Sequence, residues 1–260
     1  MKFFFFSPLS LLLALLTSCS NGQTKPAFLS YTKDTFELAR KNVHSDAKDT
    51  FEFTYKNAHP NAKVLMSEDF YWSAIEETAP FGNDDGFDAA YGFRNWRHSN
   101  KAAKPRVYLD EVIASWGYPY FDYREMDSIK IKAYISSQNP LSEEEMQQRV
   151  IQFKELLRDS PDTASRHMTD QQLRGVILSA SVGMGAIYLV GQDNAIIAIA
   201  FAQFVLEGAI DEEMRSLAII AIDRQILPVL LNRYDPRFKA RRKEQLTRML
   251  AVLNGVGSID

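Results

Sequence analysis

Apolar residues recur at helical spacing along most of the chain after residue 100. Such spacing gives each helix one apolar stripe, which a bundle buries against its neighbours. Residues that cap free backbone groups mark where helices begin. The pattern predicts helices that start at Lys104-Pro105, Ser142, Thr169 and Asp235-Pro236, and the second and third of these carry a Glu or Gln three residues later, as in a capping box.

Two segments, 194–206 and 212–231, are apolar on most sides, which is typical of helices buried in a bundle. The uncharged stretch 175–192 is rich in glycine and is followed at once by Asp193, so we interpret it as a buried helix and not as a membrane span. Only 51–55 and 129–132 alternate with the period of a β-strand. The sequence therefore predicts a mainly α fold, a compact multi-helix bundle with a small α+β subdomain near the N-terminus.

Composition divides the chain into two zones. All three tryptophans lie within residues 70–123, whereas the region after residue 161 is dominated by aliphatic residues. The polar stretch 136–140 is a plausible linker between the zones. We therefore expect an aromatic-rich N-terminal subdomain over 28–137 and a helical bundle over 138–260, although 28–260 could also form one domain.

The N-terminus has the pattern of a secretory signal peptide over residues 1–18, with Lys2 ahead of a short apolar run. The run ends in Leu16-Thr17-Ser18-Cys19, which resembles the lipobox of bacterial lipoproteins. The resemblance implies cleavage before Cys19 and attachment of acyl chains such as palmitate to it. Ser20 is not the acidic residue that retains some lipoproteins in the inner membrane, so an outer-membrane location is expected. The alternative is an ordinary cleaved signal with a chance cysteine.

Residues 19–27 are small and polar, as in a flexible tether between a lipid anchor and a folded body. The whole chain of 260 residues carries 30 Lys and Arg against 33 Asp and Glu, so no nucleic-acid partner is expected. One cysteine and four isolated histidines leave little material for a metal centre, and no catalytic or phosphate-binding motif occurs. We therefore expect neither a catalytic constellation nor a cofactor.

The most distinctive local sequence is Pro80–Asp88, a glycine-containing loop rich in oxygen ligands. Asn83, Asp84, Asp85 and Asp88 are candidate ligands for a cation on this loop. The alternative is structural: Asp84 or Asp85 caps a helix over 86–98, and Asp88 lies in its first turn.

Aromatic and arginine side chains make a second candidate, a binding surface built from Tyr91, Trp96, Arg97 and Trp116. The alternative is that these residues pack in the core, with the arginine stem lying over rings. The predicted last helix carries six basic residues over 237–248 and a single acid, which suits contact with anionic lipid or a solvated face.

Two stretches carry a family resemblance. Residues 68–97, with Phe70-Tyr71-Trp72, and residues 200–228, with Arg224-Gln225-Ile226-Leu227-Pro228, resemble the YfeS-like family of uncharacterised bacterial proteins. The resemblance implies no activity, cofactor or catalytic residue.

Together these features predict a lipid-anchored protein of the bacterial envelope, held at the membrane by Cys19, that binds a protein partner and is not an enzyme. The alternative hypothesis is a hydrolase-like or cation-dependent enzyme that uses the acidic loop 83–88 together with Arg94, Arg97 and His98.

Overall fold

The computed structural model describes residues 51–137, 141–158, 166–181, 183–256 and 258–259. The signal sequence 1–18, Cys19 and the tether 19–27 lie outside the described residues, so the predictions made for them stay predictions. Within the described part the chain forms ten α-helices and a single pair of two-residue strands. The prediction of a mainly α fold is confirmed.

The chain divides into two compact units. Of the described residues, the first unit comprises those within Ser136–Gly185, and the second comprises those within 51–135 and Ala186–Ile259. The second unit is therefore built from two segments that are far apart in the sequence, with the first unit's helices lying between them along the chain.

The first unit contains a pair of helices, α7 (Glu143–Leu157) and α9 (Asp170–Ser181). Both begin as the sequence predicts: Ser142 and Glu145 form a reciprocal capping box, and Thr169 and Gln172 exchange the same two hydrogen bonds. The apolar stripes of the two helices meet in a small core formed by Met146, Val150, Phe153, Leu157, Leu173 and Ile177.

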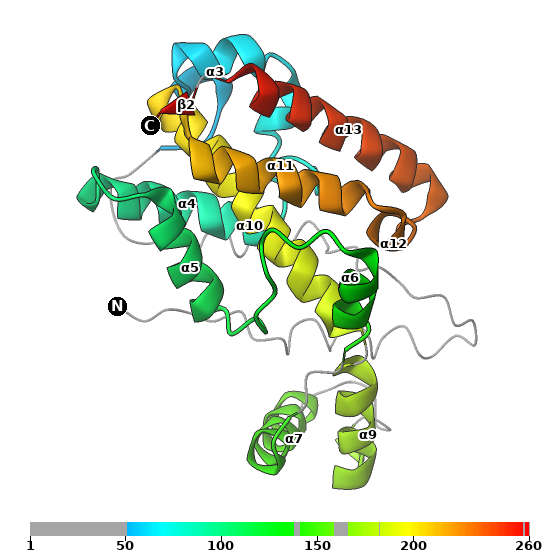
Figure 1. Cartoon of the computed structure of the whole chain (residues 1–260). Coiled ribbons are helices and arrows are strands. Elements are labelled where there is room, and N and C mark those ends of the chain that lie inside the picture. The colour runs from blue at the N-terminus through cyan, green and yellow to red at the C-terminus, as the bar shows by residue number, and fades with distance from the viewer. Residues whose placement is uncertain (1–50, 138–140, 159–165, 182, 257, 260) are drawn as a thin grey trace. The chain divides into compact units, whose positions relative to one another are not determined.

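The second unit contains most of the helices. In chain order these are α3 (Pro60–Leu65), α4 (Asp84–Ser99), α5 (Pro105–Ser115), α6 (Ser128–Ile135), most of α10 (Met184–Glu207), α11 (Glu212–Ile226), α12 (Pro228–Leu231) and α13 (Pro236–Gly255). Two 3-10 turns, η1 (Tyr55–Asn57) and η2 (Asp69–Trp72), also belong to it. Figure 1 shows α11 beside α13 and α4 beside α5, in agreement with the contacts between these helices.

Helix α10 is the centre of the second unit. Residues 195–205 are all buried, in line with the predicted central helix. It is also the one helix of the described part that is long and apolar enough to cross a membrane, and 83% of its most apolar window is buried inside the protein. The predicted continuous helix over 175–192 is wrong, because Gly183 has a φ of 80° and separates α9 from α10.

The aromatic-rich residues share one core with the C-terminal helices. Phe53, Tyr71 and Phe93 belong to the same buried cluster as Phe201 of α10 and Met249 of α13. The large rings account for this arrangement, because a helix as apolar as α10 needs cover on every side and the N-terminal aromatics supply part of it. The structure therefore gives no support to an α+β subdomain formed by the aromatic-rich zone.

Neither predicted strand forms. Residues 51–54 follow an irregular path in which Phe53 is buried and stacks on Phe81, with ring centroids 4.6 Å apart. Residues 129–132 lie in α6, where Ile131 and Ile135 are buried one helical turn apart and Ile129 is exposed. The Asp127 side chain accepts hydrogen bonds from the backbone N–H groups of residues 129 and 130, which favours a helix at this point.

The two short strands, β1 (Ile210–Asp211) and β2 (Ser258–Ile259), pair in parallel with Ile210 opposite Ser258. The chain reaches β1 through Gly208, whose φ of 75° is unfavourable for other residues and whose Cα lies against the His59 ring.

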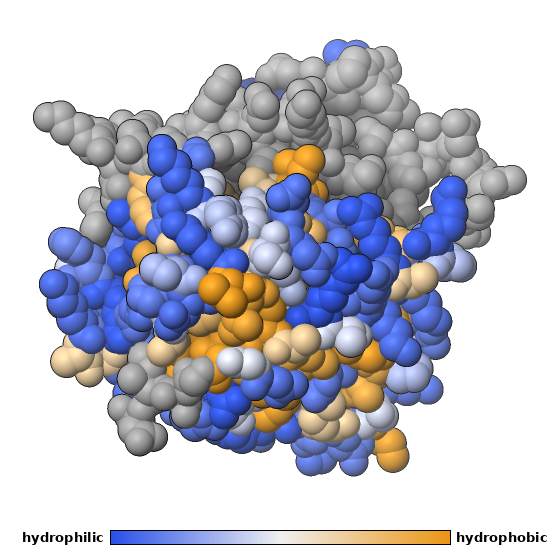
Figure 2. Space-filling view, turned by 90° about the horizontal axis from the view of Figure 1, so that it is seen from above, coloured by the Kyte–Doolittle hydropathy of each residue, from blue (hydrophilic) through white to orange (hydrophobic). Residues whose placement is uncertain are grey.

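Apolar side chains also remain on the surface, and Figure 2 shows an apolar area set among hydrophilic residues on one face.

Candidate functional site

The start of helix α4 is fixed by local chemistry. Asn83 is the N-cap, and its side-chain oxygen accepts a hydrogen bond of 2.8 Å from the backbone N–H of Gly86. The loop before it is tight, because a Cβ on Gly82 would lie 2.0 Å from the Glu76 carbonyl oxygen. The predicted helix is present, but the prediction that Asp84 or Asp85 caps it is wrong: both lie inside its first turn.

Three carboxylates, those of Asp84, Asp85 and Asp88, lie within the first five residues of α4. Asp84 and Asp88 are exposed, and Asp85 is half-buried. In the described part of the chain, no Lys, Arg or His pairs with any of the three. By contrast, Glu68 and Glu76 form ion pairs with arginines of α13. The beginning of α4 therefore carries negative charge that the described body does not neutralise.

A tyrosine side chain contacts one of these acids. The Tyr118 hydroxyl donates a hydrogen bond of 2.8 Å to Asp85 Oδ1, and the Tyr118 ring lies against Tyr188 of α10, with centroids 5.0 Å apart. Gly191 of α10 allows the Asp85 carboxylate to approach, since a Cβ there would lie 2.8 Å from Asp85 Oδ2.

A second tyrosine, Tyr108 of α5, is 9% exposed, and its hydroxyl lies over Gly92, where a Cβ would be only 2.0 Å away. Gly92 follows Asp88 by one helical turn, so the two positions share one face of α4. We call Asp84, Asp85, Asp88, Tyr108 and Tyr118 the acidic–tyrosine cluster.

The surroundings of the cluster favour protonated carboxyl groups. Burial raises the pKa of Asp85 to about 6, and the hydrogen bond from Tyr118 opposes that rise. The Asp88 side chain is exposed, but nearby protein atoms reduce its hydration; this desolvation, together with repulsion from Asp84 and Asp85, raises its pKa to about 7. Reduced hydration also raises the pKa of Asp84. Strongly perturbed carboxyl groups gathered at one place are a common mark of a functional site.

These shifts predict a pH-dependent gain of stability for Asp88→Asn. A carboxyl group with a raised folded-state pKa leaves stability intact below its unfolded pKa of about 4 and lowers it as the pH rises toward the folded value. Asparagine cannot ionise, so the variant avoids this loss. Because Asp88 is exposed, solvent screening reduces the effect, and we expect a gain of about 2–4 °C in Tm at pH 8 and none at pH 4.

Thermal unfolding followed by circular dichroism between pH 4 and pH 8 measures this difference. Glu144→Gln, which removes an exposed charge from α7, is the matched control for loss of one carboxylate. An Asp88→Asn variant with the same Tm as the wild type across the whole pH range would contradict the raised pKa.

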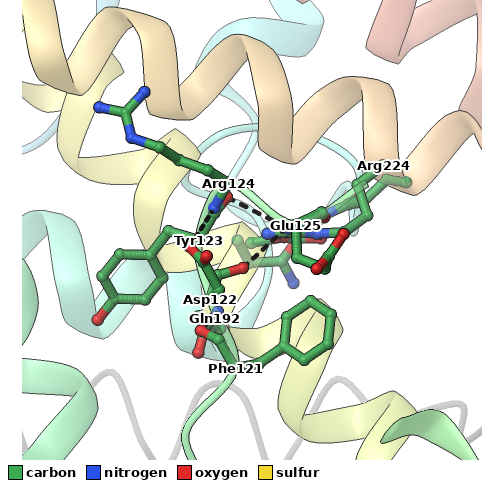
Figure 3. Close-up of polar contacts among 10 residues, drawn as sticks. Phe121, Asp122, Tyr123, Arg124, Glu125, Gln192 and Arg224 are labelled. Atoms are coloured by element: carbon green, nitrogen blue, oxygen red, sulfur yellow. Dashed lines mark hydrogen bonds and ion pairs between the residues drawn. The ribbon is translucent and has the colours of Figure 1, made fainter. Parts of the chain in front are cut away.

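A buried arginine binds the backbone of the segment that follows Tyr118. Arg224 of α11 and Asp193 of α10 are both fully buried, and Arg224 Nε lies 3.1 and 3.2 Å from the two Asp193 carboxylate oxygens. Arg224 Nη1 donates to the carbonyl oxygens of Tyr123 at 3.1 Å and Glu125 at 2.9 Å (Figure 3). Burial raises the pKa of Asp193 to about 6, and the charge and hydrogen bonds of the Arg224 guanidinium oppose that rise.

The basic residues of α13 are largely engaged within the body. Arg242 is 3% exposed, donates to Gln225 Oε1 at 2.6 Å and lies 4.5 Å from the Tyr234 ring centroid. Arg241 and Arg248 pair with Glu76 and Glu68, and Arg237 pairs with Asp235. These ion pairs neutralise positive charge that α13 would need in order to bind anionic lipid.

The residues of the enzyme hypothesis do not come together. Asp85 lies in the first turn of α4 and Arg97 and His98 lie in the last, which places them about 18 Å apart along the axis at about 1.5 Å per residue. Arg97 is already paired with Glu207 at 2.5 Å, and Arg94 lies over the Phe51 ring. Among the described residues no group of His, Cys, Asp or Glu has the spacing to hold a metal ion, and the Asn83 oxygen serves as the helix cap.

The predicted aromatic binding surface is spread through the packing of the second unit. Tyr91 and Trp96 are half-buried; Tyr91 contacts Phe53 edge to face, and Trp96 lies 5.6 Å from Tyr108. Trp116 is half-buried beside Tyr118, so Trp96 and Trp116 each lie next to a tyrosine of the acidic–tyrosine cluster. These positions match the core alternative for Tyr91 and Trp96.

Three residues that matter here were missed by the sequence patterns: Tyr108, Asp193 and Arg224. For the last two a signal was present. Each is a charged residue at the edge of, or within, an otherwise apolar helical segment, and the two charges are opposite. A buried charge requires a partner, so such a combination favours a buried ion pair.

Comparisons with known proteins give no assignment. No family model matches the chain, and neither the curated proteins nor the solved structures contain a match. The resemblance to the YfeS-like family stays a prediction based on two motifs. The second of these motifs contains Arg224, and residues 79–86 of the first include Asp84 and Asp85.

Proposed function

We propose that this chain is a lipid-anchored protein of the bacterial envelope, held in the outer membrane by acyl chains on Cys19, and that its folded body acts by binding another protein and not by catalysis. The anchor rests on the lipobox, because two or three acyl chains give stable membrane attachment where one chain gives only marginal binding.

One observation carries the binding role. The acidic–tyrosine cluster presents three carboxylates without a basic partner in the described part of the chain, beside aromatic rings. Uncompensated charge of one sign next to tyrosines is typical of a recognition surface, where charge guides the approach and rings supply contact area. The catalytic alternative loses support because Arg97 and His98 lie at the other end of α4 from Asp84 and Asp85, and Arg94 lies over the Phe51 ring.

Site-specific photo-crosslinking in intact cells tests the binding role. A photoreactive amino acid at Glu111, an exposed position one turn beyond Tyr108 on α5, should capture a discrete protein. The same group at Glu244, an exposed position on α13, is the control. The triple variant Asp84→Asn, Asp85→Asn, Asp88→Asn keeps the shape of the cluster but removes its charge, and it should abolish the product.

Equal products from both positions, or a product at Glu111 that persists in the folded triple variant, would contradict binding at the cluster. Circular dichroism of the purified variant establishes that it is folded.

A further inference from the structure

We infer that Arg242 and Gln245 of α13 bind a chloride ion inside the second unit. The inference does not depend on the proposed function and does not use the acidic–tyrosine cluster. Its first support is the balance of buried charge. In the described part of the chain, the buried side chains with a charge are those of Asp193, Arg224 and Arg242. Two guanidinium groups therefore share the interior with one carboxylate, and that carboxylate is paired with Arg224.

The hydrogen-bond partners of Arg242 are neutral. Its Nη2 donates to Gln225 Oε1 at 2.6 Å, its Nη1 donates to Thr78 Oγ1 at 3.3 Å, and the guanidinium lies over the Tyr234 ring. In the described ranges it forms no ion pair. An arginine keeps its charge, so it cannot avoid the cost of burial by losing a proton as a buried lysine can. A buried cation of this kind requires an anion beside it.

Glu77 is the acid that acts on Arg242 from the loop before α4. Reduced hydration raises the pKa of Glu77, and the charge of Arg242 opposes that rise. Glu77 is exposed, however, and no ion pair joins it to Arg242 among the described residues. A carboxylate in water offsets little of the cost of burying a guanidinium that is 3% exposed.

Two buried polar atoms indicate where the anion lies. In the part of the chain that the structure describes, Arg242 Nε and Gln245 Oε1 are the buried side-chain atoms without a hydrogen-bond partner. The two side chains are 3% and 6% exposed, and both belong to the buried face of α13. Residues three apart on a helix have Cβ atoms about 5–6 Å apart, so one small ion can contact both side chains.

The donors and their burial together select the ligand. Arg242 Nε carries a hydrogen and can only donate. The two ends of an amide have the same shape, so a half-turn about the last bond of the Gln245 side chain places its NH2 group, a second donor, at the buried position. Two donors and a positive charge select an anion. Side chains buried this deeply suit a monatomic ion, because a larger oxyanion needs a larger cavity in a close-packed interior.

Thermal unfolding of the full chain purified in detergent tests the site. Sodium chloride is compared with sodium gluconate at equal ionic strength, because gluconate screens surface charge equally but is too large for a buried site. For a Kd of about 10 mM, we expect about 150 mM chloride to raise the Tm by about 3–6 °C relative to gluconate. Chlorine NMR of the same protein should show a broadened chloride line, which bromide narrows by displacing the bound ion.

Variants identify the residues that bind the ion. Gln245→Glu keeps the shape of the side chain and places a carboxylate beside Arg242. It should have the same Tm in both salts, and in gluconate it should be more stable than the wild type. Gln245→Met keeps the volume but removes the amide, so it should weaken chloride binding about tenfold. Lys243→Met removes an exposed positive charge from the same helix and, as the matched control, should respond to chloride as the wild type does.

Equal Tm values of the wild type in the two salts, or a chloride response that persists in Gln245→Glu, would overturn the site. If Gln245→Glu does not fold, an unchanged response in Gln245→Met has the same consequence. A chloride line that is broadened equally in the wild type and the Gln245 variants would indicate an adventitious ion only and would also overturn the site.

Discussion

Replacing Arg224 with methionine is expected to lower the free energy of unfolding by about 3–5 kcal/mol, because removal of one partner leaves the other as an uncompensated buried charge. Asp193 is fully buried and has Arg224 as its ion-pair partner. The same substitution frees the carbonyl oxygens of Tyr123 and Glu125, which accept from the guanidinium. Urea denaturation followed by circular dichroism measures the loss.

Two further variants separate charge from shape. Arg224→Met combined with Asp193→Leu removes both charges, and it should recover most of the stability, since apolar residues often replace a buried pair without loss. Arg224→Lys keeps the charge but loses the planar fork that reaches both the carboxylate and the carbonyl groups, so an intermediate loss is expected. An Arg224→Met protein with the wild-type urea midpoint would be inconsistent with a buried pair.

Replacing Cys19 with alanine is expected to abolish incorporation of labelled palmitate and to release the protein from the membrane fraction. Acylation of this cysteine supplies the only anchor that the lipobox predicts, and loss of two or three chains removes effectively all of the membrane affinity. Labelling of growing cells, followed by fractionation and immunoblotting, measures both effects.

Ser20→Ala is the matched control for this experiment. It changes the neighbouring residue without touching the sulfur, and it should be labelled as the wild type is. Equal labelling of Cys19→Ala and the wild type would refute the lipobox and, with it, the envelope location.

Local signals in the sequence predicted the helix starts well. Ser142 with Glu145 and Asp235 with Pro236 begin helices where expected, because a cap satisfies backbone groups only a few residues away. Gly117, with a φ of 66°, follows the end of α5 for the same local reason. Such features depend on neighbours in the chain and need no knowledge of the tertiary fold.

The predictions that failed required distant information. The alternation over 129–132 is too short to distinguish a strand from a helix. The segment is helical because Ile131 and Ile135, one helical turn apart, are buried in a core. The candidate site shows the same limit. The acids of residues 84–88 were visible in the sequence, but Tyr118 meets Asp85 only because the chain returns to α4, and Arg224 reaches a loop about 100 residues earlier.

The division of the second unit into two chain segments has a consequence for the order of folding. Residues 50–135 cannot complete their core until residues 186–260 have been made, because α10, α11 and α13 supply its other half. Contacts so distant in sequence close late, whereas the α7–α9 pair has local contacts and can form early. During synthesis the aromatic-rich segment therefore cannot bury its apolar side chains until residues 186–260 have been made. If the signal peptide predicted over residues 1–18 directs export, this delay keeps the chain in the unfolded form that a secretion channel can pass.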